Sequence, residues 1–150
     1  MAQTKLENLI KHLRFTSRTR VGLWRMPLNK LGHEAETAVR LGIEALDVGV
    51  YVHEKLPTGA EFVRLSEQKV LESLDDISNL HGKSDCVLLY NLDLLLAGVT
   101  EDECQKIWNY LFNGFPNRTR ALLLVIPETA VRLLPMETNL EKWQLDSRLI

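Results

Sequence analysis

The chain has 150 residues, of which 45% are hydrophobic, and its formal net charge is −2. This length and composition fit a single domain, residues 1–150, with enough apolar residues for one core. No apolar run approaches the roughly 20 residues that span a bilayer, and charged residues interrupt the N-terminal segment where a signal peptide would be apolar. We therefore expect a cytoplasmic protein that does not enter a membrane.

Positive charge is concentrated near the N-terminus. Residues 1–40 contain eight Lys and Arg against three Asp and Glu, whereas residues 41–110 contain five against thirteen. Such asymmetry can mark a surface that faces nucleic acid or a partner protein, and the candidate DNA-binding residues are Lys11, Arg14, Arg18 and Arg20. No aromatic residues alternate with these bases to stack on nucleobases, so the solvated face of an ordinary helix is the favoured interpretation.

The hydrophobic pattern predicts helices and strands that alternate along the chain. Residues 1–17 contain an amphipathic helix, because Leu6, Leu9, Ile10 and Leu13 recur at helical spacing. The further predicted elements are strands at residues 20–25, 47–52, 86–90 and 121–126, helices at residues 33–46, 66–80 and from 101 onward, a short extended piece at 61–65, and one or two short helices in a C-terminal tail at 131–150. Thr100–Glu103 has the pattern of a capping box, which predicts the start of the helix at 101.

Two of the predicted strands, residues 86–90 and 121–126, are apolar throughout. Strands buried on both faces of a parallel sheet have this pattern. We therefore expect an α/β fold, a three-layer sandwich with a mainly parallel sheet of about four to five strands. Ligands bind beyond the carboxyl ends of such strands, so Asn91 and Asp93 are candidate site residues. A single aspartate after a strand is also common as a turn former.

The segment after the first strand, residues 27–34, can be compared with the phosphate-binding pattern G-x-x-x-x-G-K-[ST]. In that pattern backbone amides close on phosphate, the lysine neutralises charge and the hydroxyl holds magnesium. Gly32 matches the second glycine, but the first is a proline, and His33 and Glu34 replace the lysine and the hydroxyl residue. Like charges 4 Å apart repel by about 4 kcal/mol at an effective dielectric of about 20, so Glu34 opposes a triphosphate. Lys30 could offset part of this repulsion, and an ordinary strand-to-helix turn fits the segment equally well.

The end of the central strand departs from a catalytic pattern in a similar way. Proteins of the AAA+ type carry D-E-x-D here, where the acids orient magnesium and polarise water. Residues 90–93 align with this pattern, and only Asp93 keeps a carboxylate. Asn91 cannot act as a general base, although it could orient a water. After the last strand, Thr129 or Glu128 takes the place of a polar sensor.

With these features the chain resembles a degenerate P-loop domain of the AAA+ kind, and it is most similar to the small P-loop subunit of BREX-type bacteriophage-defence systems. The resemblance rests on the compact size, the run Val87–Leu96, the helix pattern Trp108–Leu111 and the strand entry Asn117–Leu122, and it covers residues 18–130. It implies a P-loop NTPase-like core within a subunit of a multi-protein assembly. The departures argue against ATP hydrolysis.

We therefore expect a non-catalytic pseudo-NTPase, an adaptor or regulatory subunit that binds larger protein subunits and needs no cofactor. One alternative is a weak nucleotide-binding or NTPase subunit that uses ATP and magnesium and is completed in trans by a partner. A second is a DNA-binding accessory protein, and a homo-oligomer is compatible with each. The four histidines lack ligand-like spacing, so no metal site is expected. The degenerate nucleotide site would comprise Lys30, Gly32, His33, Glu34, Asn91, Asp93 and Thr129.

Overall fold

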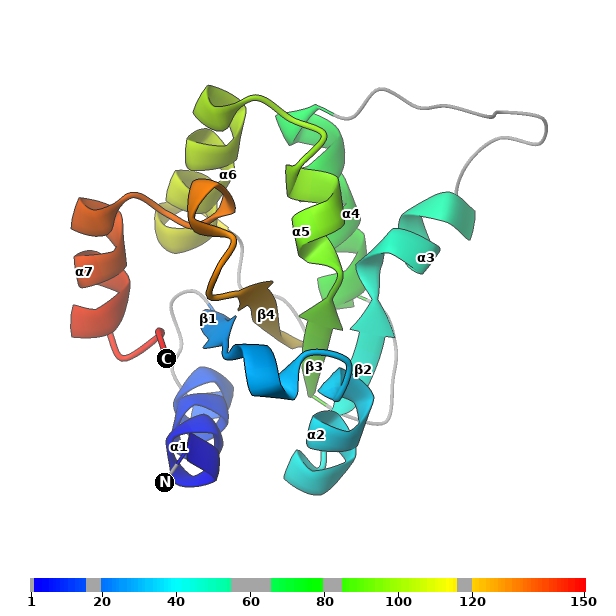
Figure 1. The fold of residues 1–150 in the computed structure, drawn as a ribbon, viewed down its shortest axis with the longest axis vertical. Helices are drawn as coiled ribbons and strands as arrows, with labels where there is room; N and C mark the ends of the chain where they lie inside the picture. The colour runs from blue at the N-terminus through cyan, green and yellow to red at the C-terminus, as the bar shows by residue number, and fades with distance from the viewer. Residues whose placement is uncertain (1, 16–19, 55–65, 80–84, 116–119) are drawn as a thin grey trace.

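A computed structural model describes residues 2–15, 20–54, 66–79, 85–115 and 120–150. Its elements, labelled in Figure 1, are α1 (Ala2–Phe15), β1 (Val21–Met26), the 3-10 helix η1 (Leu28–Lys30), α2 (Glu34–Leu41), β2 (Glu44–Asp47), α3 (Val48–Glu54), α4 (Glu67–Asn79), β3 (Cys86–Tyr90), α5 (Leu92–Leu96), α6 (Glu101–Asn113), β4 (Ala121–Pro127), the 3-10 helix η2 (Val131–Leu133) and α7 (Glu137–Leu145). Within these ranges, no helix is both long and apolar enough to cross a membrane.

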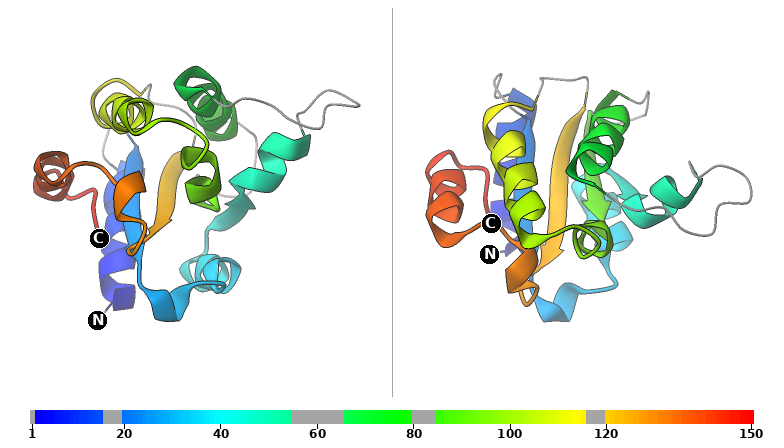
Figure 2. Two further views of the ribbon diagram at one scale, coloured as in Figure 1. Left: turned by 45° about the horizontal axis from the view of Figure 1, so that its top comes forward. Right: turned by 90° about the horizontal axis from the view of Figure 1, so that it is seen from above.

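The four strands form one parallel sheet in the order β1-β4-β3-β2. Figure 2 shows this sheet between α1 and α2 on one side and α4, α5 and α6 on the other. The expected α/β three-layer sandwich is therefore confirmed, with four strands that are all parallel. This order puts the end of β4 between the end of β1 and the end of β3, so segments far apart in the sequence meet at one edge of the sheet.

The predicted central strand is β3, and its first four residues are fully buried. Successive side chains point to opposite faces: Val87 and Leu89 join the core under α4 and α6, whereas Cys86 and Leu88 join the core under α1 and α2. Burial raises the pKa of the Cys86 thiol to about 12, so this cysteine is a packing residue rather than a nucleophile.

The helix predicted at 33–46 begins as expected but is predicted too long, and the strand predicted at 47–52 is wrong. The helix ends at Leu41, because Gly42 adopts a left-handed conformation with φ 70° and its amide closes the last turn. The strand is β2, residues 44–47, and the apolar stretch after it is the helix α3. Asp47 starts α3 by accepting a hydrogen bond from the Val50 amide at 3.1 Å.

Two predicted helix starts are confirmed. At α6, the Thr100 hydroxyl accepts a hydrogen bond from the Glu103 amide at 3.1 Å, and the Glu103 carboxylate accepts one from the Thr100 amide at 3.3 Å. At α4, Ser66 accepts a hydrogen bond from the Lys69 amide at 3.3 Å. The extended piece expected at 61–65 lies outside the described residues.

The C-terminal tail continues beyond its expected helices and lies alongside β1. After α7, the amide of Leu23 donates to the carbonyl of Arg148 at 2.8 Å, and the amide of Ile150 donates to the carbonyl of Leu23 at 2.9 Å. This one-residue parallel bridge covers the outer edge of β1.

The Arg148 side chain fixes this tail although it is only 2% exposed. Its Nε donates to the carbonyl of Val21 at 2.7 Å, and its Nη atoms donate to the carbonyls of Leu111 and Phe112 at 3.1 and 3.2 Å. The guanidinium also lies over the rings of Phe112 and Trp143, 4.8 and 4.6 Å from their centroids. One cation therefore joins β1, the C-terminal end of α6 and α7.

Candidate functional site

The predicted nucleotide-site residues lie just beyond the carboxyl ends of β1, β3 and β4. Four of them belong to the turn from β1 to α2 or to the first residue of α2. The predicted residues fall into two groups along this edge of the sheet. The Glu34 charge acts on residues at the end of β3, whereas Lys30 and Thr129 line a cleft at the ends of β1 and β4. The predicted residues therefore lie at one edge of the sheet, but at two separate places along it.

The backbone amides of the turn between β1 and α2 donate hydrogen bonds to carbonyls of the same turn. The amide of Lys30 donates to the carbonyl of Pro27 at 2.9 Å, that of Leu31 to Leu28 at 3.2 Å, and that of His33 to Lys30 at 3.0 Å. Such amides are the groups that close on phosphate in a phosphate-binding loop. Here they hold η1 and the turn that follows it instead.

Gly32 is the one residue of this turn that matches the phosphate-binding pattern, and its conformation requires glycine. Its φ is 85°, in the left-handed region that L side chains rarely adopt, and the space beside it is open. A tight strand-to-helix turn is by itself sufficient reason for this glycine.

The two residues after this glycine have different surroundings. His33 lies at the N-terminal cap of α2, is exposed, and places its Nδ1 3.2 Å from Glu36 Oε2. Glu34 lies in the first turn of α2, where the helix dipole stabilises a carboxylate. Its charge reaches the end of β3, because it contributes to raising the pKa of both Tyr90 and Asp93.

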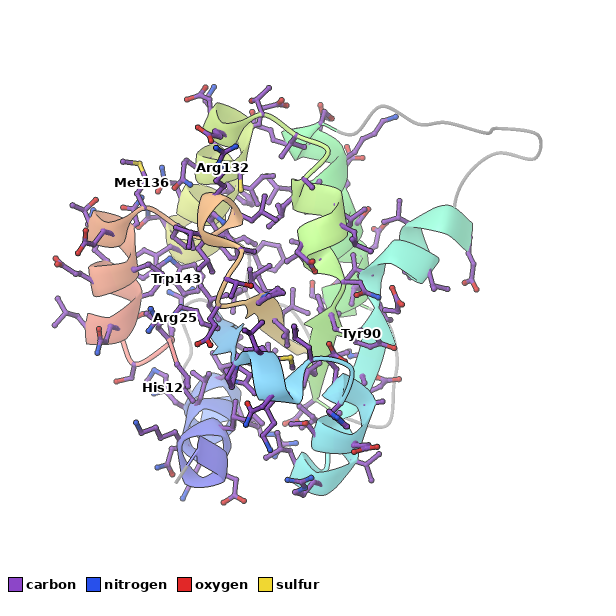
Figure 3. The ribbon with its side chains drawn as sticks, viewed as in Figure 1. His12, Arg25, Tyr90, Arg132, Met136 and Trp143 are labelled. Atoms are coloured by element: carbon purple, nitrogen blue, oxygen red, sulfur yellow. The ribbon has the colours of Figure 1, made fainter. Side chains whose placement is uncertain are left out.

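Burial is the largest cause of the raised pKa of Asp93, and Glu34 adds to it, while a hydrogen bond from the Asp93 backbone amide opposes it. For Tyr90, burial again comes first, followed by the charges of Asp47 and Glu34. Figure 3 labels Tyr90 at this end of β3. The corner between α2 and β3 is therefore a region of negative potential.

Asn91 makes a structural contact at the same corner. Its backbone is left-handed, with φ 61°, and its side-chain amide donates to Asp47 Oδ2 at 2.8 Å. Because Asp47 also caps α3, Asn91 links the ends of β2 and β3. Sequence reasoning missed Asp47, because it placed the strand there three residues too late.

A cleft of about 1060 Å³ opens beside the ends of β1 and β4. Lys30 and Thr129 line it together with three basic residues that sequence reasoning had not selected, Lys5, Arg25 and Arg40. These residues come from separate elements, so only the excess of positive charge in residues 1–40 signalled them. Figure 3 labels Arg25 between α1 and α7.

The residues predicted to bind DNA have mixed surroundings. Lys11 is exposed on α1. Arg14 Nε lies 2.7 Å from Asp85 Oδ1, and Arg20 Nε donates to the carbonyl of Leu13 at 3.1 Å, so both side chains help hold α1 to the sheet. Arg18 lies outside the described residues.

In the part of the chain that the structure describes, no three His, Cys, Asp or Glu residues are grouped to hold a metal ion. No protein family matches the sequence, and searches of curated proteins and of solved structures returned no similar protein.

The raised pKa of Asp93 gives a pH-dependent prediction. The folded protein holds this proton more tightly than the unfolded chain, so ionising Asp93 lowers the free energy of unfolding as pH rises above the ordinary aspartate value of about 3.9. Asp93→Asn should therefore be more stable than wild type at pH 7, and the difference should vanish below pH about 3.9. Urea denaturation at several pH values measures this.

The matched control is Asp102→Asn, which removes an exposed carboxylate from α6 that lies 3.4 Å from Lys106 Nζ. It should show no such gain at pH 7. If Asp93→Asn is less stable than wild type at pH 7, then its carboxylate has a stabilising partner and the negative corner is wrongly described.

Proposed function

We propose that the chain is a non-catalytic, P-loop-like subunit that binds larger proteins, a pseudo-NTPase adaptor of a bacterial phage-defence complex. Support for the defence role comes from the resemblance of residues 18–130 to the small P-loop subunit of BREX-type systems. Support for the loss of catalysis comes from the chain's own residues. The observation that carries the loss of catalysis is the hydrogen bonding and charge of the turn at residues 27–34.

Three amides of this turn already donate to carbonyls within it. A phosphate that entered would have to break these hydrogen bonds before it could accept from the same amides, and each is worth about 1 kcal/mol. Binding would therefore begin with a cost that an open phosphate loop does not have.

Charge at the same place also opposes a nucleotide. The N-terminus of a helix is a favourable site for a phosphate, but in α2 Glu34 and Glu36 already supply negative charge to the first turn. At the facing end of β3, Asp93 has a raised pKa and Asn91 is hydrogen-bonded to Asp47. Asn91 has no carboxylate, so these two residues do not form the pair of carboxylates that magnesium and an attacking water require.

A phosphate-release assay with ATP and magnesium tests this proposal, first with the purified chain and then with proteins encoded by neighbouring genes. We expect no release above the buffer rate from the chain alone, and no loss of the complex's activity when Asp93 is replaced by asparagine. Because this variant should remain folded, release that depends on the chain and falls in Asp93→Asn would contradict a non-catalytic role.

A further inference from the structure

The cleft beside the ends of β1 and β4 has a strongly uneven charge. Four cationic side chains line it, Lys5 from α1, Arg25 from β1, Lys30 from η1 and Arg40 from α2, against one acidic side chain, that of Glu128. Lys5 and Arg25 are exposed and Lys30 is half-buried. Charges of one sign on four separate elements favour an anionic occupant that contacts several of them at once.

Between these charges, the lining of the cleft is apolar. Leu6 and Leu134 are nearly buried at 3% and 6% exposure, and Leu140 and Ile150 are half-buried. Trp24 also contributes, but at 4% exposure it offers no free ring face on which a nucleobase could stack. The lining therefore fits aliphatic or aromatic side chains of an occupant better than bases.

The cleft also continues into a neighbouring hollow of about 450 Å³. The two share Lys5, Arg25 and Ile150, and the hollow extends past His12 of α1 and Leu149 of the tail. The main cleft alone, at about 1060 Å³, slightly exceeds the volumes of about 300–1,000 Å³ that are typical of small-molecule pockets. An elongated occupant matches this shape better than a compact one.

We propose that this basic cleft binds an acidic segment of a partner protein that also carries apolar side chains. The inference rests on the proposed adaptor function and names the surface that performs it. Carboxylates of the segment pair with Lys5, Arg25 and Lys30, while its apolar residues cover Leu140 and the exposed Val131, which also lines the cleft. The charge complementarity and the apolar lining together select an acidic peptide over a nucleic acid.

Selection from displayed random peptides of about 12 residues, which span about 40 Å when extended, tests the inference on the whole chain. Enriched peptides should combine Asp or Glu with Leu, Ile or Phe. In fluorescence anisotropy, the double variant Arg25→Glu, Lys30→Glu should bind the best peptide at least about tenfold more weakly than wild type. Affinity should also fall as salt increases, because the paired charges are partly exposed.

Lys69→Glu, on the exposed side of α4 across the sheet, is the matched control and should bind like wild type. The inference is wrong if no peptides are enriched, if the enriched peptides are not acidic, or if the double variant binds them unchanged. It is also wrong if single-stranded DNA or ATP displaces the peptide at lower concentration than unlabelled peptide does. Phosphate release by the chain would refute the proposed function without affecting this binding result, so the two can fail separately.

Discussion

Replacing Arg148 by alanine should lower the free energy of unfolding by about 3–5 kcal/mol, because several buried hydrogen bonds from a charged group and a large buried side chain are lost together. The substitution leaves the carbonyls of Val21, Leu111 and Phe112 without their donor. It also leaves a cavity between two aromatic rings. Urea denaturation monitored by tryptophan fluorescence measures the change, and Trp143 beside the guanidinium reports on the same region.

Two further variants separate the geometry of Arg148 from its charge. Arg148→Lys keeps the charge but cannot reach three carbonyls while stacking between rings, so it should recover only a minority of the lost stability. Lys142→Ala removes an exposed cation from α7 and should change stability by less than about 0.5 kcal/mol. If Arg148→Ala lowers the free energy of unfolding by less than about 1 kcal/mol, Arg148 does not stabilise the packing of the tail as its contacts indicate.

The second large effect is a gain of ATP binding when the turn at 27–34 is converted to a phosphate-binding pattern. The triple variant Pro27→Gly, His33→Lys, Glu34→Thr restores the first glycine, the lysine and the hydroxyl. Removing one like charge about 4 Å from a phosphate is worth about 4 kcal/mol, so affinity should rise by about a thousandfold. Calorimetry with ATP and magnesium measures this directly.

The control for this variant keeps the carboxylate at position 34 and removes its neighbour, as Pro27→Gly, His33→Lys, Glu36→Thr. Both triple variants lose one acid from the first turn of α2 and have the same net charge, but only the first has a hydroxyl in place of the carboxylate at position 34. The control should stay without measurable binding. If the first triple variant also fails to bind ATP, the turn is an ordinary strand-to-helix connection rather than a degenerate phosphate loop.

The layers of the fold could be predicted because the strongest signals are local. Continuous apolar strands at 86–90 and 121–126 indicate burial on both faces, and the Thr100–Glu103 pattern marks the start of α6. The prediction for residues 33–52 was partly wrong because short apolar stretches fit a helix or a strand equally well. There the left-handed Gly42 and the cap at Asp47 decided the outcome.

The features that depend on distant residues could not be predicted from the pattern. Arg148 contacts the carbonyl of a residue 127 positions earlier, and nothing in its own neighbourhood marks it as buried. The basic cleft likewise combines Lys5, Arg25 and Lys30 from three elements. At the candidate nucleotide site the residue types could be read from the sequence. The hydrogen bonds that the amides of the turn donate within it depend on the conformation of the turn and could not be predicted.

The most direct test of the central claim is calorimetric titration of the wild-type chain with ATP and magnesium. Because the amides of the turn are occupied and Glu34 lies at the start of α2, we expect no heat of binding at micromolar nucleotide. Saturable binding with a micromolar dissociation constant would contradict the account and favour a nucleotide-binding subunit.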